Sequence, residues 1–352
     1  MNCFCVLGDC SAKECHHCFP VINCSENHDF CKKYGCCKEI LQEKVLVTGC
    51  AGFIGSHVCE ELLKQQYDVV GIDIINDYYD IEKKIKNLDI LCKYSNFSFE
   101  KEDICTTTII GKYKPDKIIH LASMAGVRYS IENPYIYDKI NIGGFIHIME
   151  EAVKHNVKQV VYASSSSVYG LNKKVPFSEN DEIEGCNSPY ACSKLAMEIF
   201  AKTYYQLYKI PNIGLRFFTV YGPRGRPDMA PYKFLNAIKN GESFKKFGDG
   251  NTSRDYTYVS DIISGIISAM KNEKQIQCEV YNLGNSAPVT LNEFIKLCEE
   301  VTNKQAIYEE IPMQLGDVPH TYADITKAKQ DLDYEPKTSL KEGLRYMFES
   351  IS

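Results

Sequence analysis

A glycine-rich loop between a short apolar strand and a helix is the feature that most constrains this fold. Residues 44–49, KVLVTG, form an apolar run ending in glycine, which is typical of a buried parallel strand. Residues 53–66, FIGSHVCEELLKQQ, have helical apolar spacing, and Gly49, Gly52 and Gly55 lie at the junction. Glycines allow a tight turn there, and the helix N-terminus offers free N–H groups to a pyrophosphate. The pattern predicts a dinucleotide-binding site in an α/β fold.

An acidic residue ends the next predicted strand. Residues 67–73, YDVVGID, are mainly apolar and end at Asp73, where a carboxylate binds the ribose hydroxyls of adenosine. A carboxylate repels the 2′-phosphate of NADP, so the pattern favours NAD. The alternative is a glycine turn that binds no ligand, but strand, glycines, helix and acid all agree on the dinucleotide.

Strands and helices continue to alternate along the chain. Apolar runs at 115–123, 157–167 and 213–218 predict strands, and long helices are expected around 133–155 and at 189–208. Such alternation predicts βαβ units and a parallel sheet, because parallel strands need crossover connections.

Length and composition limit the class of protein. The 352 residues, 44% hydrophobic and 24% charged, suffice for one large domain or two domains sharing a core. The net charge of −6, without a basic block, argues against a nucleic-acid partner. No apolar run approaches about 18 residues, and the N-terminus lacks a signal pattern. We expect a cytoplasmic protein that is not bound to a membrane.

A tyrosine and a lysine one helical turn apart, Tyr190 and Lys194, begin the predicted helix 189–208. They share a helix face, and the positive charge of the lysine would lower the pKa of the phenol from about 10. Ser165 or Ser167, at the end of a predicted strand, would hydrogen-bond the same substrate hydroxyl. These residues form a catalytic set that takes a proton from an alcohol while hydride leaves its carbon. An isolated pair of this spacing would instead be a solvated surface pair.

Five segments together resemble the extended short-chain dehydrogenase/reductase family, in its nucleotide-sugar branch: VTGCAGFIGSH, HLAS, YASSSSVYG, SPYACSK and RDYTYVSDI. GIDIINDYYD, AGVRYSIENP, FFTVYGPRGRPDMA and QLGDVPHTYAD are similar to UDP-glucuronate 4-epimerases in particular. The resemblance implies a Rossmann-type doubly wound parallel sheet, with an NAD-binding domain over 43–215. A smaller C-terminal α/β domain for the UDP-sugar would span 216–352, with some segments returning to the first. It also implies a homodimer in which the two long helices form a four-helix bundle.

The resemblance assigns further site residues. The cofactor-binding positions are Gly49, Gly52, Phe53, Ile54, Gly55, Asp73, Asp103, Ile104, Ala122, Tyr190 and Lys194. His120 lines the cofactor pocket in relatives, although a histidine in an apolar strand is often only packed. The substrate-binding positions are Ser166, Thr219 and Arg226 around a sugar carboxylate, Arg254 at the diphosphate and Asp317 near the uridine ribose. The alternatives are that Arg226 pairs with Asp228 or contacts phosphate, that Arg254 is a strand-edge cation, and that Asp317 is a turn residue.

Relatives diverge after the oxidation of C4. Dehydratases carry an Asp-Glu pair before Val-Tyr-Gly, and UDP-glucuronate decarboxylases usually a Glu, where this chain has Ser166 and Ser167. The missing carboxylate favours simple epimerisation through a 4-keto sugar. The hydroxyls and Arg226 favour UDP-glucuronate, converted to UDP-galacturonate, over UDP-glucose or UDP-N-acetylglucosamine. A non-catalytic NAD sensor is the other class, and the intact tyrosine, lysine and serine set argues against it.

The N-terminal extension, residues 1–42, lies outside the resemblance. It holds nine of the 17 cysteines. The spacings Cys15-x2-Cys18 and His28-x2-Cys31 are typical of zinc ligands, whereas the alternative is a thiol-rich tail with adventitious metal affinity. No firm metal site follows, because nine cysteines exceed one tetrahedral site, and the partner of this extension is unknown.

Overall fold

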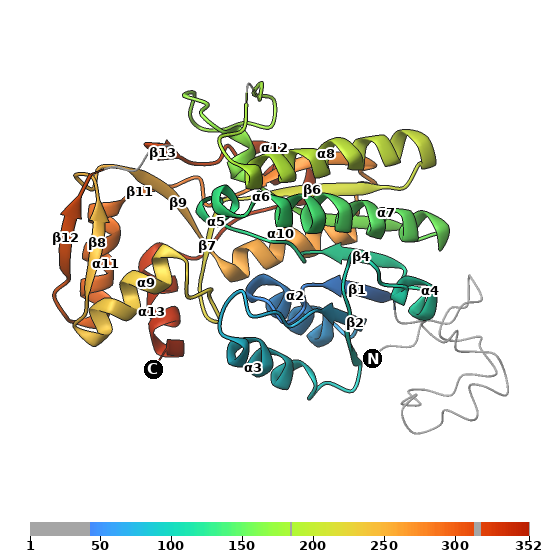
Figure 1. Ribbon diagram of the computed structural model, residues 1–352, viewed down its shortest axis with the longest axis horizontal. Coiled ribbons are helices and arrows are strands. Elements are labelled where there is room, and N and C mark those ends of the chain that lie inside the picture. The colour runs from blue at the N-terminus through green and yellow to red at the C-terminus, as the bar shows by residue number, and fades with distance from the viewer. Residues whose placement is uncertain (1–42, 184, 313–317, 352) are drawn as a thin grey trace, which may run out of the picture. The chain divides into compact units, whose positions relative to one another are not determined.

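A seven-stranded parallel sheet forms the centre of the protein, as the computed structural model shows for residues 43–183, 185–312 and 318–351 (Figure 1). The strand order is β10-β6-β5-β4-β1-β2-β3, so the order reverses between β1 and β4. The strands are β1 (Lys44–Thr48), β2 (Asp68–Asp73), β3 (Phe97–Lys101), β4 (Lys117–His120), β5 (Gln159–Ser165), β6 (Asn212–Phe217) and β10 (Cys278–Leu283). The reversal produces a crevice at the carboxyl ends of the strands. The predicted doubly wound α/β fold is confirmed.

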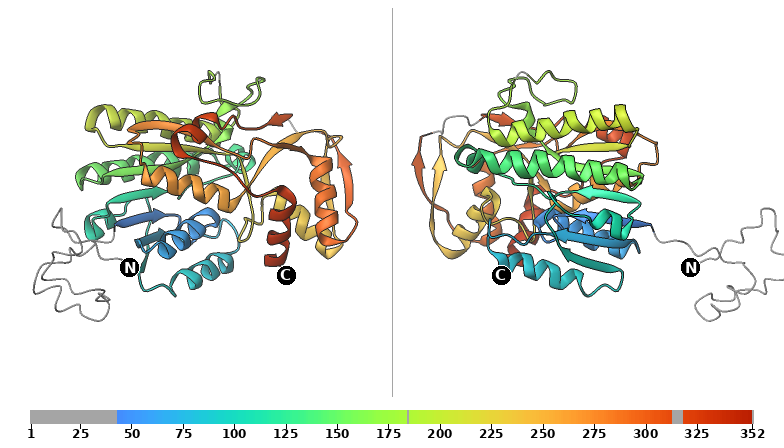
Figure 2. Two further views of the ribbon diagram at one scale, coloured as in Figure 1. Left: turned by 180° about the vertical axis from the view of Figure 1, so that it is seen from behind. Right: turned by 45° about the vertical axis from the view of Figure 1, so that its right-hand side comes forward.

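Helices cover both faces of this sheet (Figure 2). Successive residues of a strand point to opposite faces. Val45 and Val47 of β1 accordingly pack with α2 (Phe53–Lys64) and α10 (Val259–Lys271). Leu46 packs instead with α7 (Gly144–Lys154) and α8 (Pro189–Tyr208). Burial on both faces explains why the strands read as continuous apolar runs.

The helix expected around 133–155 is three consecutive segments. They are α6 (Pro134–Tyr137), a π-helical segment η1 (Asp138–Gly143) and α7. The π-helical segment turns Asn141 into the core, where its amide donates to the Ser193 hydroxyl (2.9 Å) and the Met124 carbonyl (2.9 Å). The wider helical turn thereby ties the loop after β4 to α8.

The C-terminal part has smaller sheets and its own core. A four-stranded sheet contains β7 (Thr219–Tyr221), β9 (Ser253–Tyr258), β11 (Pro288–Thr290) and β13 (His320–Thr321), and β8 (Ser243–Phe247) pairs with β12 (Ile307–Ile311). Helices α9 (Ala230–Asn240), α11 (Leu291–Thr302) and α13 (Leu340–Ile351) enclose a cluster around Phe234, Phe294 and Leu344. Strand β10 returns to the central sheet beside β6. The domain boundary at 215/216 stays a prediction.

Five helical segments remain to be named. They are α3 (Ile81–Leu91), α4 (Ile109–Tyr113), α5 (Val127–Glu132), the 3₁₀ turn η2 (Ser166–Tyr169) and α12 (Thr326–Leu332). The strand expected over 157–167 ends at Ser165, because the Ser165 hydroxyl accepts from the Ser167 N–H (3.1 Å) and starts η2. Among the described helices, none has the length and apolarity that crossing a bilayer requires.

Candidate active site

One cavity of about 710 Å³ lies at the carboxyl ends of the central strands, beside the point where the strand order reverses. Almost all the expected site residues line it. They are Gly49, Gly52, Phe53, Ile54, Gly55, Asp73, Asp103, Ile104, Ala122, Ser165, Ser166, Ser167, Tyr190, Lys194, Thr219 and Arg226. Asp317 lies outside the described residues, as do Cys15, Cys18, His28 and Cys31 of the zinc hypothesis.

The glycine loop is built by close backbone contacts. Gly49 has a φ of +74°, and its N–H donates to the Ile72 carbonyl at 2.8 Å. A Cβ on Gly55 would lie 2.0 Å from the Gly49 carbonyl oxygen, so no larger residue fits. Gly52 begins α2 without a side-chain cap, which leaves the first helical N–H groups directed at the cavity. This cradle fits an anionic pyrophosphate.

Backbone amides hold the carboxylate at the end of β2 in place. Asp73 accepts from the Ala51 N–H at 3.2 Å and from the Ile75 N–H at 2.9 Å. The carboxylate borders the cavity next to the glycine loop, where an adenosine ribose would lie. Asp103 is held similarly, through the Cys105 N–H at 2.9 Å. The residues present therefore fit an adenine dinucleotide.

His120 supports the cofactor wall from behind and does not line the cavity. The Thr48 hydroxyl oxygen accepts from the Leu121 and Ala122 N–H groups (3.1 Å each), so its own proton goes to His120 Nδ1 at 3.0 Å. Burial lowers the pKa of His120 to about 3, so the ring is neutral. The structure favours the packed interpretation of His120, in which it positions Ala122.

The start of α8 presents Tyr190 and Lys194 beside the end of β5. Ser188 caps the helix by accepting from the Ala191 N–H at 3.2 Å, which places the tyrosine in the first turn. Burial raises the pKa of the Tyr190 phenol, while a hydrogen bond with Ser165 and the charge of Arg226 act to lower it. The expected lowering of this pKa by Lys194 is not among these effects, and it stays a prediction.

Lys194 is almost completely buried behind the tyrosine. Its Nζ donates to the Ala163 carbonyl of β5 at 2.9 Å, and burial lowers the pKa of the ammonium to about 7. At neutral pH a lysine with this pKa is partly deprotonated, unlike a surface lysine. The pair is a titratable couple inside the cavity wall rather than a solvated surface pair.

The sequence arguments missed a buried ion pair that supports these groups. Glu198, one turn after Lys194, accepts from Arg216 Nη2 at 2.7 Å and from Arg216 Nε at 2.9 Å. The Ser164 hydroxyl donates to the same carboxylate at 2.5 Å. The pair fixes α8, β5 and β6 to one another just behind Ser165. A charged residue in the apolar strand IGLRFF was the available signal, because a buried arginine requires a partner.

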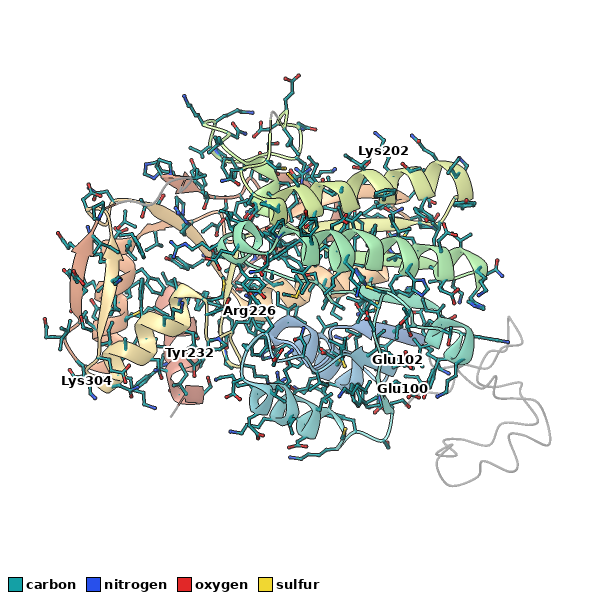
Figure 3. The ribbon with its side chains drawn as sticks, in the orientation of Figure 1. Glu100, Glu102, Lys202, Arg226, Tyr232 and Lys304 are labelled. Carbon is teal, nitrogen blue, oxygen red and sulfur yellow. The ribbon has the colours of Figure 1, made fainter. Side chains whose placement is uncertain are left out.

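Arg226 also lines the cavity, at the junction between the central sheet and the C-terminal elements (Figure 3). Its Nε and Nη2 donate to the two carboxylate oxygens of Asp228, at 3.0 Å and 2.5 Å. Nη2 also approaches the Tyr78 hydroxyl at 3.4 Å. The pairing with Asp228, considered above as an alternative, is thus present. A role for Arg226 toward a sugar carboxylate, with Ser166 and Thr219, stays a prediction.

Arg254 is the described candidate that the structure does not bring to the cavity wall. It lies on β9, and its Nη1 donates to the carbonyls of Ser253 (2.9 Å) and Pro319 (3.3 Å). These contacts match the strand-edge cation that was the alternative interpretation. Its role at a diphosphate stays a prediction.

A glycine cradle, a ribose-binding acid and a Tyr-x-x-x-Lys helix that open into one cavity define an enzyme of the extended short-chain dehydrogenase/reductase class. Within it, the family model described as GDP-mannose 4,6 dehydratase matches residues 46–347. The chain belongs to this family, and the membership of the extended short-chain dehydrogenase/reductase family that the motifs predicted is confirmed.

Characterised relatives extend over nearly the whole matched region. A UDP-glucuronate 4-epimerase of Thermodesulfobacterium geofontis is 41% identical over 305 residues, 85% of this chain and 93% of the relative. The crystal structure of a Bacillus cereus UDP-glucuronic acid 4-epimerase in complex with UDP-glucuronic acid and NAD is 36% identical, with a TM-score of 0.84. A Thermotoga maritima UDP-glucose 4-epimerase with UDP-glucose is 34% identical, with a TM-score of 0.80. Each alignment with these two structures covers 88% of this chain and 98% of the other.

Proposed function

We propose that this protein is an NAD-dependent 4-epimerase of a UDP-sugar, and that it converts UDP-glucuronate to UDP-galacturonate. The observation that carries the proposal is the shared cavity. Tyr190 and Ser165 on one wall and Arg226 on the other meet in a single space with the dinucleotide cradle. Relatives named for this activity align over 85% and 88% of the chain.

The proton chemistry falls to the end of β5 and the start of α8. Tyr190 takes the proton from the C4 hydroxyl and later returns it, and Ser165 bonds the same oxygen. Lys194 stabilises the phenolate through its charge when it is protonated. Bound NAD supplies the hydride acceptor at C4 and the hydride donor for its return. The cycle has no net oxidation, so the cofactor is not consumed.

The other wall selects the sugar. Ser166 and Thr219 offer hydroxyls, and Arg226 offers a planar fork for the C5 carboxylate. A 4-keto-glucuronate is a β-keto acid, and it loses CO₂ when the bond to its carboxylate aligns with the carbonyl π system. A carboxylate held out of this alignment is protected. No carboxylate side chain stands at Ser166 or Ser167 to promote elimination.

A UDP-glucose 4-epimerase is the second candidate, and one observation favours it. Asp228 already pairs with Arg226, so the cavity offers a guanidinium whose charge is balanced. A sugar with a neutral hydroxymethyl group at C5 would then bind without a carboxylate partner. The Thermotoga maritima structure holds a sugar of that kind.

The deciding experiment is an NMR time course of the purified protein with UDP-glucuronate and no added NAD. UDP-galacturonate as product supports the proposal and indicates that the cofactor is carried tightly. A pentose product means decarboxylation, and turnover of UDP-glucose alone favours the second candidate. Tyr190→Phe serves as the control, because it keeps the ring and is expected to lower turnover by about 10²–10⁴-fold. Retention of most activity by this variant contradicts the assignment of Tyr190.

We also infer that the protein forms a homodimer through α8 and the neighbouring α7. Ile199 and Leu207 of α8 are 60% and 67% exposed, and an interface that covers this helix would bury both. The two helices lie side by side on the same face of the sheet (Figure 2). Light scattering after gel filtration should give twice the chain mass of 40.0 kDa. Ile199→Lys with Leu207→Lys should shift it to the monomer.

A further inference from the structure

A rigid turn joins Arg226 to the acid that pairs with it. Residues 226–229, Arg-Pro-Asp-Met, are closed by a hydrogen bond from the Met229 N–H to the Arg226 carbonyl at 3.2 Å. Pro227 occupies the second turn position, where its fixed φ suits a β-turn. The turn brings the Asp228 carboxylate against the guanidinium of Arg226, two residues earlier in the chain. Little additional chain entropy is therefore lost when the pair forms.

The two carboxylate oxygens occupy one particular edge of the guanidinium. Asp228 binds Nε and Nη2, which is the side edge, at 3.0 Å and 2.5 Å. The other bidentate edge of an arginine consists of Nη1 and Nη2. Among the residues that the structure describes, no second carboxylate pairs with Arg226. The end edge, whose Nη2 also lies 3.4 Å from the Tyr78 hydroxyl, is the part of this side chain that remains for another carboxylate.

Tyr78 restrains the same guanidinium from a second direction. The Arg226 Cζ lies 5.4 Å from the centre of the Tyr78 ring, and the Tyr78 hydroxyl donates to the Ala125 carbonyl at 2.6 Å. Gly126 makes room for this arrangement, since a Cβ there would lie 3.0 Å from the Tyr78 hydroxyl. Arg226 is thus held along one edge and one face, with a side-chain exposure of 17%.

We propose that Asp228 is a positioning residue that gives the site its selectivity for a carboxylate-bearing sugar, an inference that rests on the proposed function. It holds Arg226 by the side edge, so that the end edge meets the C5 carboxylate. An unpaired arginine would lose more rotamer freedom when it binds, and its charge would attract anions of any shape. With Asp228 in place the charge is balanced, and a carboxylate gains affinity only by matching the geometry of the free edge.

The test compares two substrates on matched variants. Asp228→Ala should raise KM for UDP-glucuronate about tenfold and change kcat by less than about threefold, because the contact orients bound substrate rather than the reacting atoms. Asp228→Asn keeps an acceptor for Nε but turns an amide N–H₂ group toward Nη2, so it should recover only part of the loss. Constants for UDP-glucose should not change. Asp249→Asn removes the same unit of charge from an exposed loop outside the cavity and should behave as the unmodified protein.

Calorimetric binding of UDP-glucuronate and UDP-glucose to the same variants separates this proposal from the proposed function. Loss of the preference for UDP-glucuronate in Asp228→Ala supports the positioning role, even if the unmodified protein epimerises another sugar. An unmodified protein that binds both sugars equally overturns it. A KM for UDP-glucuronate that falls in Asp228→Ala also overturns it, because Asp228 would then compete with the substrate. Unchanged constants in that variant contradict it as well.

Discussion

The two sides of the cavity are built from different parts of the chain. The cofactor side is mainly backbone, in which Gly49 and Gly55 pack against main-chain atoms and N–H groups face the site. The sugar side consists of side chains such as Arg226 and Tyr78, which come from segments far apart in the sequence and restrain one another. A site built from close-packed main chain has almost no room for added side-chain atoms. A site built from side chains depends instead on the neighbouring groups that hold each side chain in place. The following predictions test this contrast, starting with the largest expected effect.

The backbone side should fail completely when one methyl group is added. Gly55→Ala would place a Cβ 2.0 Å from the Gly49 carbonyl oxygen, so the loop has to move. We expect little folded protein and no retained NAD, a larger cost than the ~1–3 kcal/mol of ordinary overpacking. Thermal unfolding and the nucleotide content of the purified protein measure both effects.

Gly52→Ala is the matched control on the same loop. Its Cβ would lie 3.1 Å from the same oxygen, so a small shift accommodates it. It should retain the fold with weaker NAD binding. If Gly55→Ala melted at the same temperature as the unmodified protein and retained the same amount of NAD, the glycine loop would not be close-packed.

The ion pair behind the catalytic residues should be the most costly side-chain interaction. Glu198→Gln keeps the shape of the side chain but leaves Arg216, which is 4% exposed, without an opposite charge. Breaking a buried pair costs about 3–5 kcal/mol. Urea unfolding measures this loss. Glu300→Gln breaks an exposed pair with Lys341 and should leave the free energy of unfolding nearly unchanged, because water screens the two charges. Equal effects from the two variants would contradict a special role for burial.

The contrast between main-chain and side-chain sites also explains which features the sequence predicted. The glycine loop, Asp73 and the Tyr190–Lys194 pair depend on local order along the chain, so a motif reports them. The pairing of Arg216 with Glu198 depends on how β6 packs against α8, which no local pattern encodes.

The sequence alone already offers the pairing of Arg226 with Asp228 as an alternative to a contact with a sugar carboxylate. Which edge Asp228 occupies required coordinates. The π-helical segment is similar, because its cause is the inward Asn141 rather than a periodic pattern.

The sugar side should respond selectively rather than completely. Arg226→Ala should lower kcat/KM for UDP-glucuronate by about 30–100-fold, the value of a charge-assisted bidentate contact. UDP-glucose should change by less than about threefold. Arg226→Lys keeps the charge without the fork and should recover only part of the loss. Equal losses with both sugars would mean that Arg226 supports the fold or contacts a part that the two substrates share.

The smallest effect per pH unit concerns Lys194, a residue of the cavity lining. Its pKa is lowered from 10.5 to about 7 by burial, so between these values the unfolded chain holds one more proton than the folded protein. Unfolding free energy therefore rises with pH in this window, by up to about 1.4 kcal/mol per pH unit. Lys194→Met has no such proton and should lack this slope.

Urea unfolding of both proteins is measured between about pH 7.5 and 9.5. The difference between their unfolding free energies then gives the slope due to Lys194, because the titration of the buried tyrosines and cysteines contributes to both proteins. A constant offset, such as the loss of the contact to Ala163, leaves the slope unchanged. Parallel curves would mean that Lys194 keeps its proton throughout this range. The ammonium would then be stabilised in the folded protein despite its burial, and the lysine would act as a fixed charge beside Tyr190 instead of a titrating one.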